Sequence, residues 1–401
     1  MSRRIVVLTT SRADFSHLQW PLRHLLENPA LETQLIVTGA HLSEEFGHSV
    51  DEILTAGFEV DHTTECLLSS DTDIGMAKTI GIATLGLSDL LGHIRPDLLL
   101  LIADRYEMLA PAAVALALRI PVAHIEGGEI SEGAIDDAVR NAITKLAHLH
   151  FTPTEAARQR VIAMGEEAWR VHAVGAPSLD TLKKVKLYRR DELNRRLGIE
   201  LGGSLCLVAL HPVTLLEDTL AESDAVIEAL EQVDRQVVFC FPNADAGSRK
   251  LIRRARDFCA RHPDAHVFVN LAPELYWSLL AQSDLLVGNS SSGIMETPAL
   301  GIPTVNIGIR QQGRYRAANI IDTPANAATI LAAVQRAVSA DFRSGLDGMD
   351  NPYGDGRAGE RIAQTLAEAP PRDVLLHKRG LAVATDDAGR YAFRQQPDPG
   401  Q

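Results

Sequence analysis

Short runs of consecutive apolar residues recur along the whole chain, and they constrain the fold more than any other feature of the sequence. The runs show no polar–apolar alternation, which is typical of strands buried on both faces of a parallel sheet. They are Ile5–Leu8, Leu35–Val37, Leu98–Ile102, Pro121–Ile125, Val171–Val174, Leu205–Leu210, Val237–Phe241, His266–Val269, Leu285–Val287 and Thr304–Ile307.

Segments of helical length separate these runs. They are Leu18–Glu27, Met76–His93, Ala134–His148, Thr154–Met164, Ala221–Gln232, Ser248–Arg261 and Pro273–Gln282. Alternating strands and helices are the signature of α/β domains with right-handed crossovers.

The alternation occurs twice, on either side of a polar connector at Leu182–Leu197, and a length of 401 residues suits two domains. We therefore expect two Rossmann-like, doubly wound lobes that face a cleft. The expected N-terminal lobe covers residues 1–178 and holds the acid/base carboxylates. The expected C-terminal lobe, which binds a nucleotide, covers residues 179–369, and residues 370–401 form a loosely ordered tail.

Composition excludes several classes of function. The formal net charge of −13 argues against non-specific binding to nucleic acid or to anionic membranes. No window reaches about 20 uninterrupted apolar residues, and the N-terminus has no signal-peptide pattern, so we expect a cytoplasmic protein. The four cysteines have neither disulfide nor zinc-ligand spacing, which favours buried reduced thiols.

The loop Gly288–Glu296 follows one apolar run and leads into a segment that we expect to be helical. Glycine and small hydroxyl residues at such a junction leave backbone N–H groups available to a phosphate, which the helix dipole also favours. Glu296 could accept hydrogen bonds from ribose hydroxyls. The alternative is an ordinary capped helix, since Ser and Asn are preferred N-caps.

Polar clusters follow five other expected strands, at the carboxyl ends where ligands bind in such sheets. Together with the loop and flanking segments, they form an ordered set of motifs: Thr10–Asp14, Asp104–Glu107, His124–Glu129, Ile135–Asp137, Ala142–Lys145, His148–His150, His211–Thr214, Pro242–Ser248, Gly288–Glu296 and Asn306–Arg314.

This set, spanning roughly residues 4–365, resembles the hydrolysing UDP-N-acetylglucosamine 2-epimerases of sialic and related nonulosonic acid biosynthesis. The resemblance implies a glycosyltransferase-B-like fold, no metal, no nicotinamide cofactor, and a homodimer or homotetramer. It also implies a reaction. UDP leaves C1 as the C2 proton is removed, giving a 2-acetamidoglucal, and water then adds to yield N-acetylmannosamine.

The resemblance assigns acid/base roles to Asp104, Glu126 and Asp136 without saying which is acid and which is base. It places His211 near the diphosphate. Asp104 could instead pair with Arg105 or cap a helix, and Asp136 could be a helix N-cap. The other histidines, His124, His148 and His150, are interpreted as supporting residues.

The nucleotide-binding residues implied by the resemblance come from both expected lobes. Three lie in the N-terminal lobe, and Arg310 suits a diphosphate because its guanidinium offers a fork of donors. The full set is Arg12, Ser16, Arg105, Asn243, Ser290, Ser291, Glu296 and Arg310, and Arg314 and Arg316 could add to the same basic pocket.

The chain departs from the family pattern at two positions. Ala103 stands where glycine is common, and Asn141 stands where histidine is common. Ala103 adds a methyl group at a tight turn beside Asp104. Asn141 can form hydrogen bonds but cannot carry a proton at neutral pH.

Several functions remain open at this stage. The enzyme could be non-hydrolysing and release UDP-N-acetylmannosamine, or it could act on 4-acetamido-6-deoxy (diacetylbacillosamine) analogues linked to UDP or GDP. The same fold could carry a glycosyltransferase. Ala103 and Asn141 also leave room for a catalytically silent nucleotide-sugar binding protein.

Overall fold

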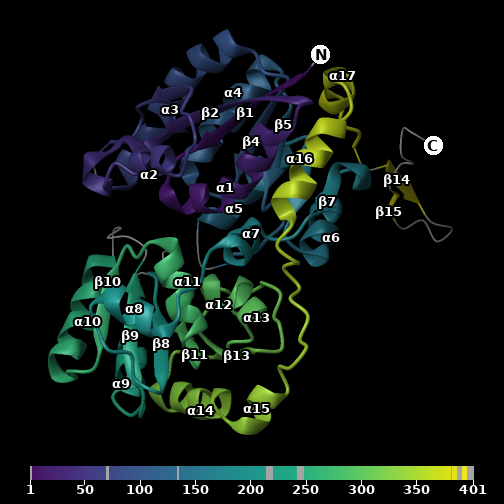
Figure 1. Ribbon diagram of the computed structural model, residues 1–401. Helices are drawn as coiled ribbons and strands as arrows, with labels where there is room; N and C mark the ends of the chain where they lie inside the picture. The colour runs from purple at the N-terminus through teal and green to yellow at the C-terminus, as the bar shows by residue number, and fades with distance from the viewer. Residues whose placement is uncertain are drawn as a thin grey trace. The chain divides into compact units, whose positions relative to one another are not determined.

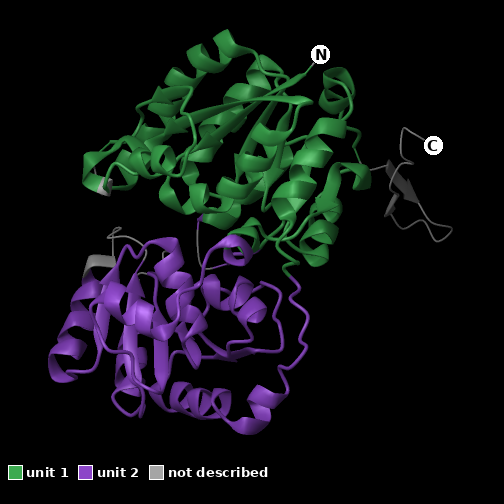
Figure 2. Ribbon diagram, viewed as in Figure 1, with its two compact units in different colours: residues 1–129, 136–181, 353–401 green, residues 130–135, 182–352 purple. Residues whose placement is uncertain are grey.

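The computed structural model confirms the α/β class, with two parallel sheets flanked by helices (Figure 1). It describes residues 2–68, 72–132, 135–213, 220–241, 248–380, 382–385 and 391–394. The chain forms two compact units (Figure 2). The N-terminal unit comprises residues 1–129, 136–181 and 353–401, and the C-terminal unit comprises residues 130–135 and 182–352. The boundaries expected at 178 and 369 stay predictions.

The sheet of the N-terminal unit has the strand order β3-β2-β1-β4-β5-β6-β7, and all its pairings are parallel. Its strands are β1 (Arg3–Thr9), β2 (Leu31–Thr38), β3 (His62–Thr64), β4 (Leu98–Ile102), β5 (Val122–Ile125), β6 (Leu149–Thr152) and β7 (Val171–Ala173). All five side chains of β4 are fully buried. A central strand covered on both faces requires the continuous apolar run seen in the sequence.

The helices of this unit are α1 (Arg12–Glu27), α2 (Val50–Thr55), α3 (Asp73–Ile94), α4 (Leu109–Leu118), α5 (Asp136–Leu146), α6 (Glu155–Ala163), α16 (Ala358–Glu368) and α17 (Arg372–Leu376). Helix α7 (Pro177–Lys184) begins in this unit and ends in the C-terminal unit. By length and composition, α3 is apolar enough to cross a membrane, and 28% of its most apolar window is buried.

The C-terminal part of the chain returns to the N-terminal unit, where α16 packs against α1 (Figure 1). Gly359 permits this close approach, because a Cβ there would lie 2.8 Å from the backbone nitrogen of Pro21. Asp180 on α7 accepts hydrogen bonds from the N–H groups of Ala358 and Gly359 and so caps α16. The short strands β14 (Ala382–Thr385) and β15 (Tyr391–Arg394) form an antiparallel pair.

The C-terminal unit has a second parallel sheet in the order β10-β9-β8-β11-β12-β13. Its strands are β8 (Leu205–Ala209), β9 (Gln236–Phe241), β10 (His266–Val269), β11 (Leu285–Gly288), β12 (Thr304–Ile307) and β13 (Ile320–Thr323). Its helices are α8 (Arg190–Leu197), α9 (Ala221–Leu230), α10 (Ser248–Arg261), α11 (Pro273–Ala281), α12 (Ser292–Met295), α13 (Thr297–Leu300), α14 (Ala327–Ala337) and α15 (Ala340–Ser344).

Candidate active site

The central strands β4 and β5 are each followed directly by a residue with left-handed backbone conformation. Ala103 has φ +59° and Glu126 has φ +66°, values that glycine adopts without strain and other residues rarely adopt. Both residues still take part in the backbone hydrogen bonding of the sheet. The Ala103 N–H donates to the Ile125 carbonyl, and the Glu126 N–H donates to the Phe151 carbonyl. The chain therefore turns sharply at the carboxyl edge of the sheet, where it presents Asp104 and the Glu126 carboxylate.

Asp104 forms an ion pair with Arg140 on α5. Only 2% of the Arg140 side chain is exposed, and its guanidinium also donates to the Glu129 carbonyl at 3.0 Å. The alternative pairing of Asp104 with Arg105 is not seen, because Arg105 instead contacts the buried Glu107 at 2.9 Å. A buried cation thus compensates the charge of the Asp104 carboxylate.

Glu126 contacts His17 on α1, with Oε1 2.7 Å from the ring Nδ1. Both groups can gain and lose protons, and 12% of the Glu126 side chain remains exposed. His17 did not emerge from the sequence. Its position one residue after Ser16, on the helix that follows the first strand, was the only available signal.

Asp136 is the first residue of α5, so its carboxylate lies at the helix N-terminus, where negative charge is favoured. The neighbouring Asp137 accepts a hydrogen bond from Asn141 at 3.1 Å and lies 3.6 Å from Arg140. Asn141 is therefore part of the polar face of α5 that includes Arg140 and Asp137.

The loop after β1 is organised by Asp14. Its carboxylate accepts hydrogen bonds from the backbone and hydroxyl groups of Thr10 and Ser11 at 2.7–3.0 Å, which forms a capping box. Arg12, at the start of α1, pairs with Glu52, and the Ser16 hydroxyl donates to the Ala13 carbonyl at 2.7 Å. This loop lies at the same edge of the sheet as the carboxylates.

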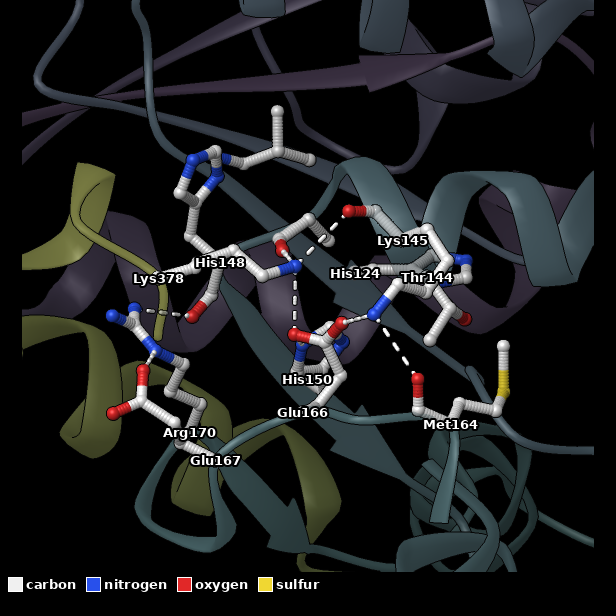
Figure 3. A network of polar contacts seen from close by, with 12 residues as sticks. His124, Thr144, Lys145, His148, His150, Met164, Glu166, Glu167, Arg170 and Lys378 are labelled. Atoms are coloured by element: carbon white, nitrogen blue, oxygen red, sulfur yellow. Dashed lines mark hydrogen bonds and ion pairs between the residues drawn. The ribbon is translucent and has the colours of Figure 1, made fainter. Parts of the chain in front are cut away.

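A buried network supports α5 from its other end (Figure 3). The Glu166 carboxylate, which is fully buried, is reached by Lys145 of α5 at 2.6 Å, His150 at 3.1 Å and Lys378 at 2.7 Å. Burial alone would raise the pKa of Glu166, but the hydrogen bond from His150 and the nearby ammonium groups outweigh it and lower that pKa to about 2. Lys378 belongs to the expected tail, residues 370–401, so its ion pair with Glu166 connects that segment to this unit.

The histidines interpreted as supporting residues are buried. His124 Nε2 lies 2.8 Å from the Ala103 carbonyl, and the Val122 N–H donates to His148 Nδ1 at 3.1 Å. Burial lowers the pKa of each ring to about 4, so both are neutral at neutral pH. His124 therefore stabilises the turn before Asp104 as a hydrogen-bonding group.

In the C-terminal unit, β11 ends at Gly288, whose φ is +146°. A Cβ on this residue would lie 2.0 Å from the Ala209 carbonyl oxygen, so only glycine fits. The next residue, Asn289, bridges to His211 at the end of β8. It accepts from the His211 N–H at 2.7 Å and donates to the His211 carbonyl at 2.9 Å.

The expected helix after Ser291 divides into the one-turn helices α12 and α13, which meet at Glu296. Pro298 cannot donate a hydrogen bond, which favours a new helix start there. Ser290 accepts from the Ser292 N–H at 3.3 Å, and Glu296 is buried. Several N–H groups of the loop therefore already have hydrogen-bond partners. Because α12 and α13 are each about one turn long, they do not supply the dipole of a long helix to a bound phosphate.

Arg310 extends toward this loop, and its guanidinium donates to the Asn289 carbonyl at 3.0 Å. Burial, together with the Arg310 cation, lowers the pKa of His211 to about 3, so the ring acts as a neutral donor or acceptor. Sequence reasoning missed Glu222, which accepts from the Ile309 N–H at 3.1 Å. Burial raises the pKa of Glu222.

The structure brings Asp104 and Glu126 to neighbouring strand ends in one unit, and His211, Ser290, Ser291, Glu296 and Arg310 to one region of the other. The predicted Asn243 lies outside the described residues. Within the described ranges, no three His, Cys, Asp or Glu side chains gather in a way that could hold a metal ion.

Solved structures share this two-unit α/β architecture, which is of the glycosyltransferase-B type. A crystal structure of UDP-GlcNAc 2-epimerase from Neisseria meningitidis, bound to UDP-GlcNAc, matches with a TM-score of 0.78 at 18% identity. The match covers 91% of this chain and 100% of that one. A Methanocaldococcus jannaschii UDP-GlcNAc 2-epimerase in complex with UDP-GlcNAc and UDP matches with a TM-score of 0.75 at 19% identity, covering 92% and 100%.

The sequence narrows this class to one family. The model of the UDP-N-acetylglucosamine 2-epimerase family matches residues 23–367, and the chain belongs to that family. It is 36% identical to a UDP-N,N'-diacetylbacillosamine 2-epimerase (hydrolyzing) of Legionella pneumophila, over 94% of this chain and 99% of the relative. It is 34% identical to a GDP/UDP-N,N'-diacetylbacillosamine 2-epimerase (hydrolyzing) of Campylobacter jejuni, over 94% and 98%.

Proposed function

We propose that this protein is a hydrolysing 2-epimerase that releases UDP and a free, 2-epimerised sugar from a UDP-linked 2-acetamido sugar. The observation that carries the proposal is the pair of strand-end carboxylates with unlike partners. Glu126 contacts a histidine, whereas Asp104 contacts a buried arginine. Family membership and the names of the relatives support the reaction type.

The chemistry requires a base at C2 and a proton donor on the opposite face of the ring. In the first step a base takes the C2 proton, the C–H electron pair forms the C1–C2 double bond, and the C1–oxygen bond breaks as UDP leaves. In the second step water adds its oxygen to C1, and C2 receives a proton on the other face. Positioned acids and bases typically contribute 10²–10⁴-fold to such transfers.

We assign the first proton transfer to Glu126, because His17 at 2.7 Å can exchange a proton with it. Asp104, which Arg140 holds in place, and Asp136 at the start of α5 are assigned to the return of a proton. Carboxylates with different neighbours can hold different protonation states in one site.

We assign the nucleotide to the Gly288–Glu296 loop and the residues beside it. Arg310 supplies a cation, the neutral His211 supplies a hydrogen-bonding ring, and Ser290, Ser291 and Glu296 supply small or acidic polar groups. Arg12, Ser16, Arg105 and Asn243 are proposed to complete the binding of the substrate. An arginine fork suits diphosphate oxygens.

UDP-N,N'-diacetylbacillosamine is the proposed substrate, because two relatives named for it are 36% and 34% identical. UDP-N-acetylglucosamine is the second candidate, since a UDP-N-acetylglucosamine 2-epimerase of Neisseria meningitidis is 31% identical over 94% of this chain. A role in sialic or nonulosonic acid biosynthesis in the cytoplasm follows from either substrate as part of the proposal.

The test is to incubate the purified protein with each sugar nucleotide in D₂O and follow proton and phosphorus NMR. We expect free UDP and a C2-deuterated free sugar, with kcat/KM higher for the diacetylated substrate. A UDP-linked epimer would instead identify a non-hydrolysing enzyme. Binding of UDP with no turnover of either sugar would contradict the proposed activity.

A further inference from the structure

A lysine from the C-terminal segment of the chain contacts the end of α5 that lies farthest from Asp136. The ammonium group of Lys378 donates to the Lys145 carbonyl at 3.0 Å and to the Ala147 carbonyl at 2.7 Å. These carbonyls lie at the C-terminal end of α5, where helix carbonyls lack partners within the helix and where the helix dipole favours a cation. Lys378 therefore caps α5 from a distant part of the sequence.

A third acceptor completes the contacts of the Lys378 ammonium group (Figure 3). Its Nζ lies 2.7 Å from Oε2 of the fully buried Glu166, and the other carboxylate oxygen lies 2.6 Å from Lys145 of α5. An ammonium group has three N–H donors, and here each of them has an acceptor. Only 22% of the Lys378 side chain is exposed, so water competes little for these contacts.

The chain on both sides of Lys378 is held in place by buried or partly buried groups. Arg170, which is 1% exposed, donates to the His377 carbonyl at 2.9 Å. The Arg379 N–H donates to Glu167 Oε2 at 3.2 Å. Lys378 is therefore a fixed point for α5, although it belongs to the segment expected to be a loosely ordered tail.

The last turn of α5 also contacts the turn that presents Asp104. Thr144 Oγ1 is 3.4 Å from Nδ1 of His124, and the other ring nitrogen of His124 contacts the Ala103 carbonyl at 2.8 Å. Both Thr144 and His124 are fully buried, and close-packed interiors transmit displacements. A shift of α5 would thus reach Asp104 by two routes, through His124 and through the ion pair with Arg140.

We propose that Lys378 is a positioning residue for the epimerase reaction, and that it acts by fixing the C-terminal end of α5. The inference rests on the proposed function, which assigns proton transfer to Asp104 and Asp136. Asp136 lies about 14 Å from Lys145 along the helix, and a helix carries a displacement from one end to the other as a rigid element. Lys378 therefore sets the placement of both carboxylates without touching the substrate.

Arg372 offers a matched comparison within the same segment. Its guanidinium donates to the Arg119 carbonyl at 2.6 Å and 3.0 Å, directly after the last residue of α4. Both cations thus bind carbonyls at a helix C-terminus, but α4 carries none of the residues assigned to proton transfer or to the nucleotide. If such contacts only stabilise the fold, removal of either cation should have the same effect on turnover.

The test compares the kinetics of sugar release in the wild type, Lys378→Met and Arg372→Met, together with titrations of UDP. Lys378→Met should lower kcat about tenfold or more, because small displacements of catalytic groups are costly, and should change KM and the UDP affinity less than about twofold. Lys378→Arg keeps the cation and should recover most of the lost kcat. Arg372→Met should retain the kcat of the wild type.

Hydrogen exchange followed by mass spectrometry supplies a readout that does not need turnover. The amides of the last turn of α5 should exchange faster in Lys378→Met, whereas only those of α4 should do so in Arg372→Met. Lys378→Gln keeps an N–H donor and gives the same readouts if Lys378→Met does not fold.

Two results would overturn the inference. Wild-type kcat in Lys378→Met, or an equal loss of kcat in Lys378→Met and Arg372→Met, would refute the positioning role. Unchanged exchange of α5 in Lys378→Met would refute the anchoring of the helix. A wild type that turns over neither sugar nucleotide would contradict the proposed function instead, and faster exchange of α5 in Lys378→Met would then still support the anchoring.

Discussion

The two units position their polar groups by different means. In the N-terminal unit, charged side chains are positioned by ion pairs and hydrogen bonds with other side chains. Arg140 pairs with Asp104, and His17 contacts Glu126. Glu166 contacts two lysines and a histidine. In the C-terminal unit, the polar groups are positioned by the backbone conformation and by the side-chain amide of Asn289. Gly288 permits the turn, and Asn289 links two strand ends through both of its side-chain groups.

This contrast matches what each half of the proposed reaction needs. Proton transfer requires titratable groups with partners that tune and orient them. Binding of a diphosphate requires a shaped loop and a cation, but no group that changes its protonation state. Variants that change a titratable group should therefore affect turnover, whereas variants that change the shape of the loop should affect nucleotide binding.

Glu126→Gln should lower kcat about 10³-fold, because glutamine preserves the shape of the side chain but cannot accept the C2 proton. UDP binding should be unchanged, since Glu126 is not among the residues assigned to the nucleotide. Kinetics with UDP titrations would measure both, and Glu360→Gln, an exposed residue of the same unit that pairs with Arg357, is the matched control. Full activity in Glu126→Gln would refute the assigned role.

Gly288→Ala should destabilise the C-terminal unit by about 3 kcal/mol or more and abolish UDP binding. The new Cβ would clash with the Ala209 carbonyl, and the backbone would have to move. Gly301→Ala is the matched control, because Gly301 also has a positive φ (+63°) but open space around it. We expect the control to cost about 1 kcal/mol in chemical denaturation. Equal losses would show that strain alone, without the clash, decides stability.

Acidification should destabilise both units, because each buries histidines whose pKa is lowered, and it should destabilise the N-terminal unit more, since that unit buries more of them. Burial lowers the pKa of His41, His124 and His148 to about 4, whereas an unfolded histidine has a pKa near 6.5. The unfolded chain thus binds more protons below pH 6.5, so stability is present above that pH and is lost as the pH falls toward 4. Each ring contributes a loss of about 2 kcal/mol at pH 5.

Denaturation of His41→Gln and of the wild type at about pH 7.5 and pH 5 measures this effect. The variant should lose about 2 kcal/mol less than the wild type between the two conditions. The exposed His93→Gln serves as the control and should behave as the wild type does. Identical pH dependence in all three proteins would contradict the argument from buried imidazoles.

Ala103→Gly should stabilise the protein slightly, by about 0.5–1 kcal/mol. Alanine at φ +59° is strained, and the relief outweighs the added entropy of the unfolded chain. Ala332→Gly in the exposed interior of α14 should have the opposite sign, a loss of about 1 kcal/mol. A thermal melt of both variants checks the pair. Loss of stability in both would mean that Ala103 is not strained.

Continuous apolar runs predicted most strands correctly, because a strand covered on both faces leaves no ambiguity. They missed β3, β6 and β13, and also β14 and β15 in the segment expected to be a loosely ordered tail. In β6 the sequence Leu149-His-Phe-Thr interrupts the apolar run with His150, which is buried and satisfied by Glu166. A search for apolar runs does not predict a strand that contains a polar residue, even where that residue is buried and hydrogen-bonded.

The strand-end motifs identified Asp104 and Glu126 but not their partners. His17 is 109 positions from Glu126 in the chain, and Arg140 is 36 positions from Asp104. Spacing cannot predict such pairs, because they depend on how α1 and α5 lie across the sheet. The φ of +59° at Ala103, by contrast, is one that glycine adopts without strain, which gives a physical reason to expect glycine at this position.

Periodicity and ordered motifs are local properties of neighbouring residues, and they were enough to predict the two parallel sheets, the sheet edge that carries the polar loops and the family. The pairing of the charged groups, by contrast, depends on how the helices and strands pack. The Glu126–His17 and Asp104–Arg140 contacts join residues from separate strands and helices, and their geometry exists only after those elements pack.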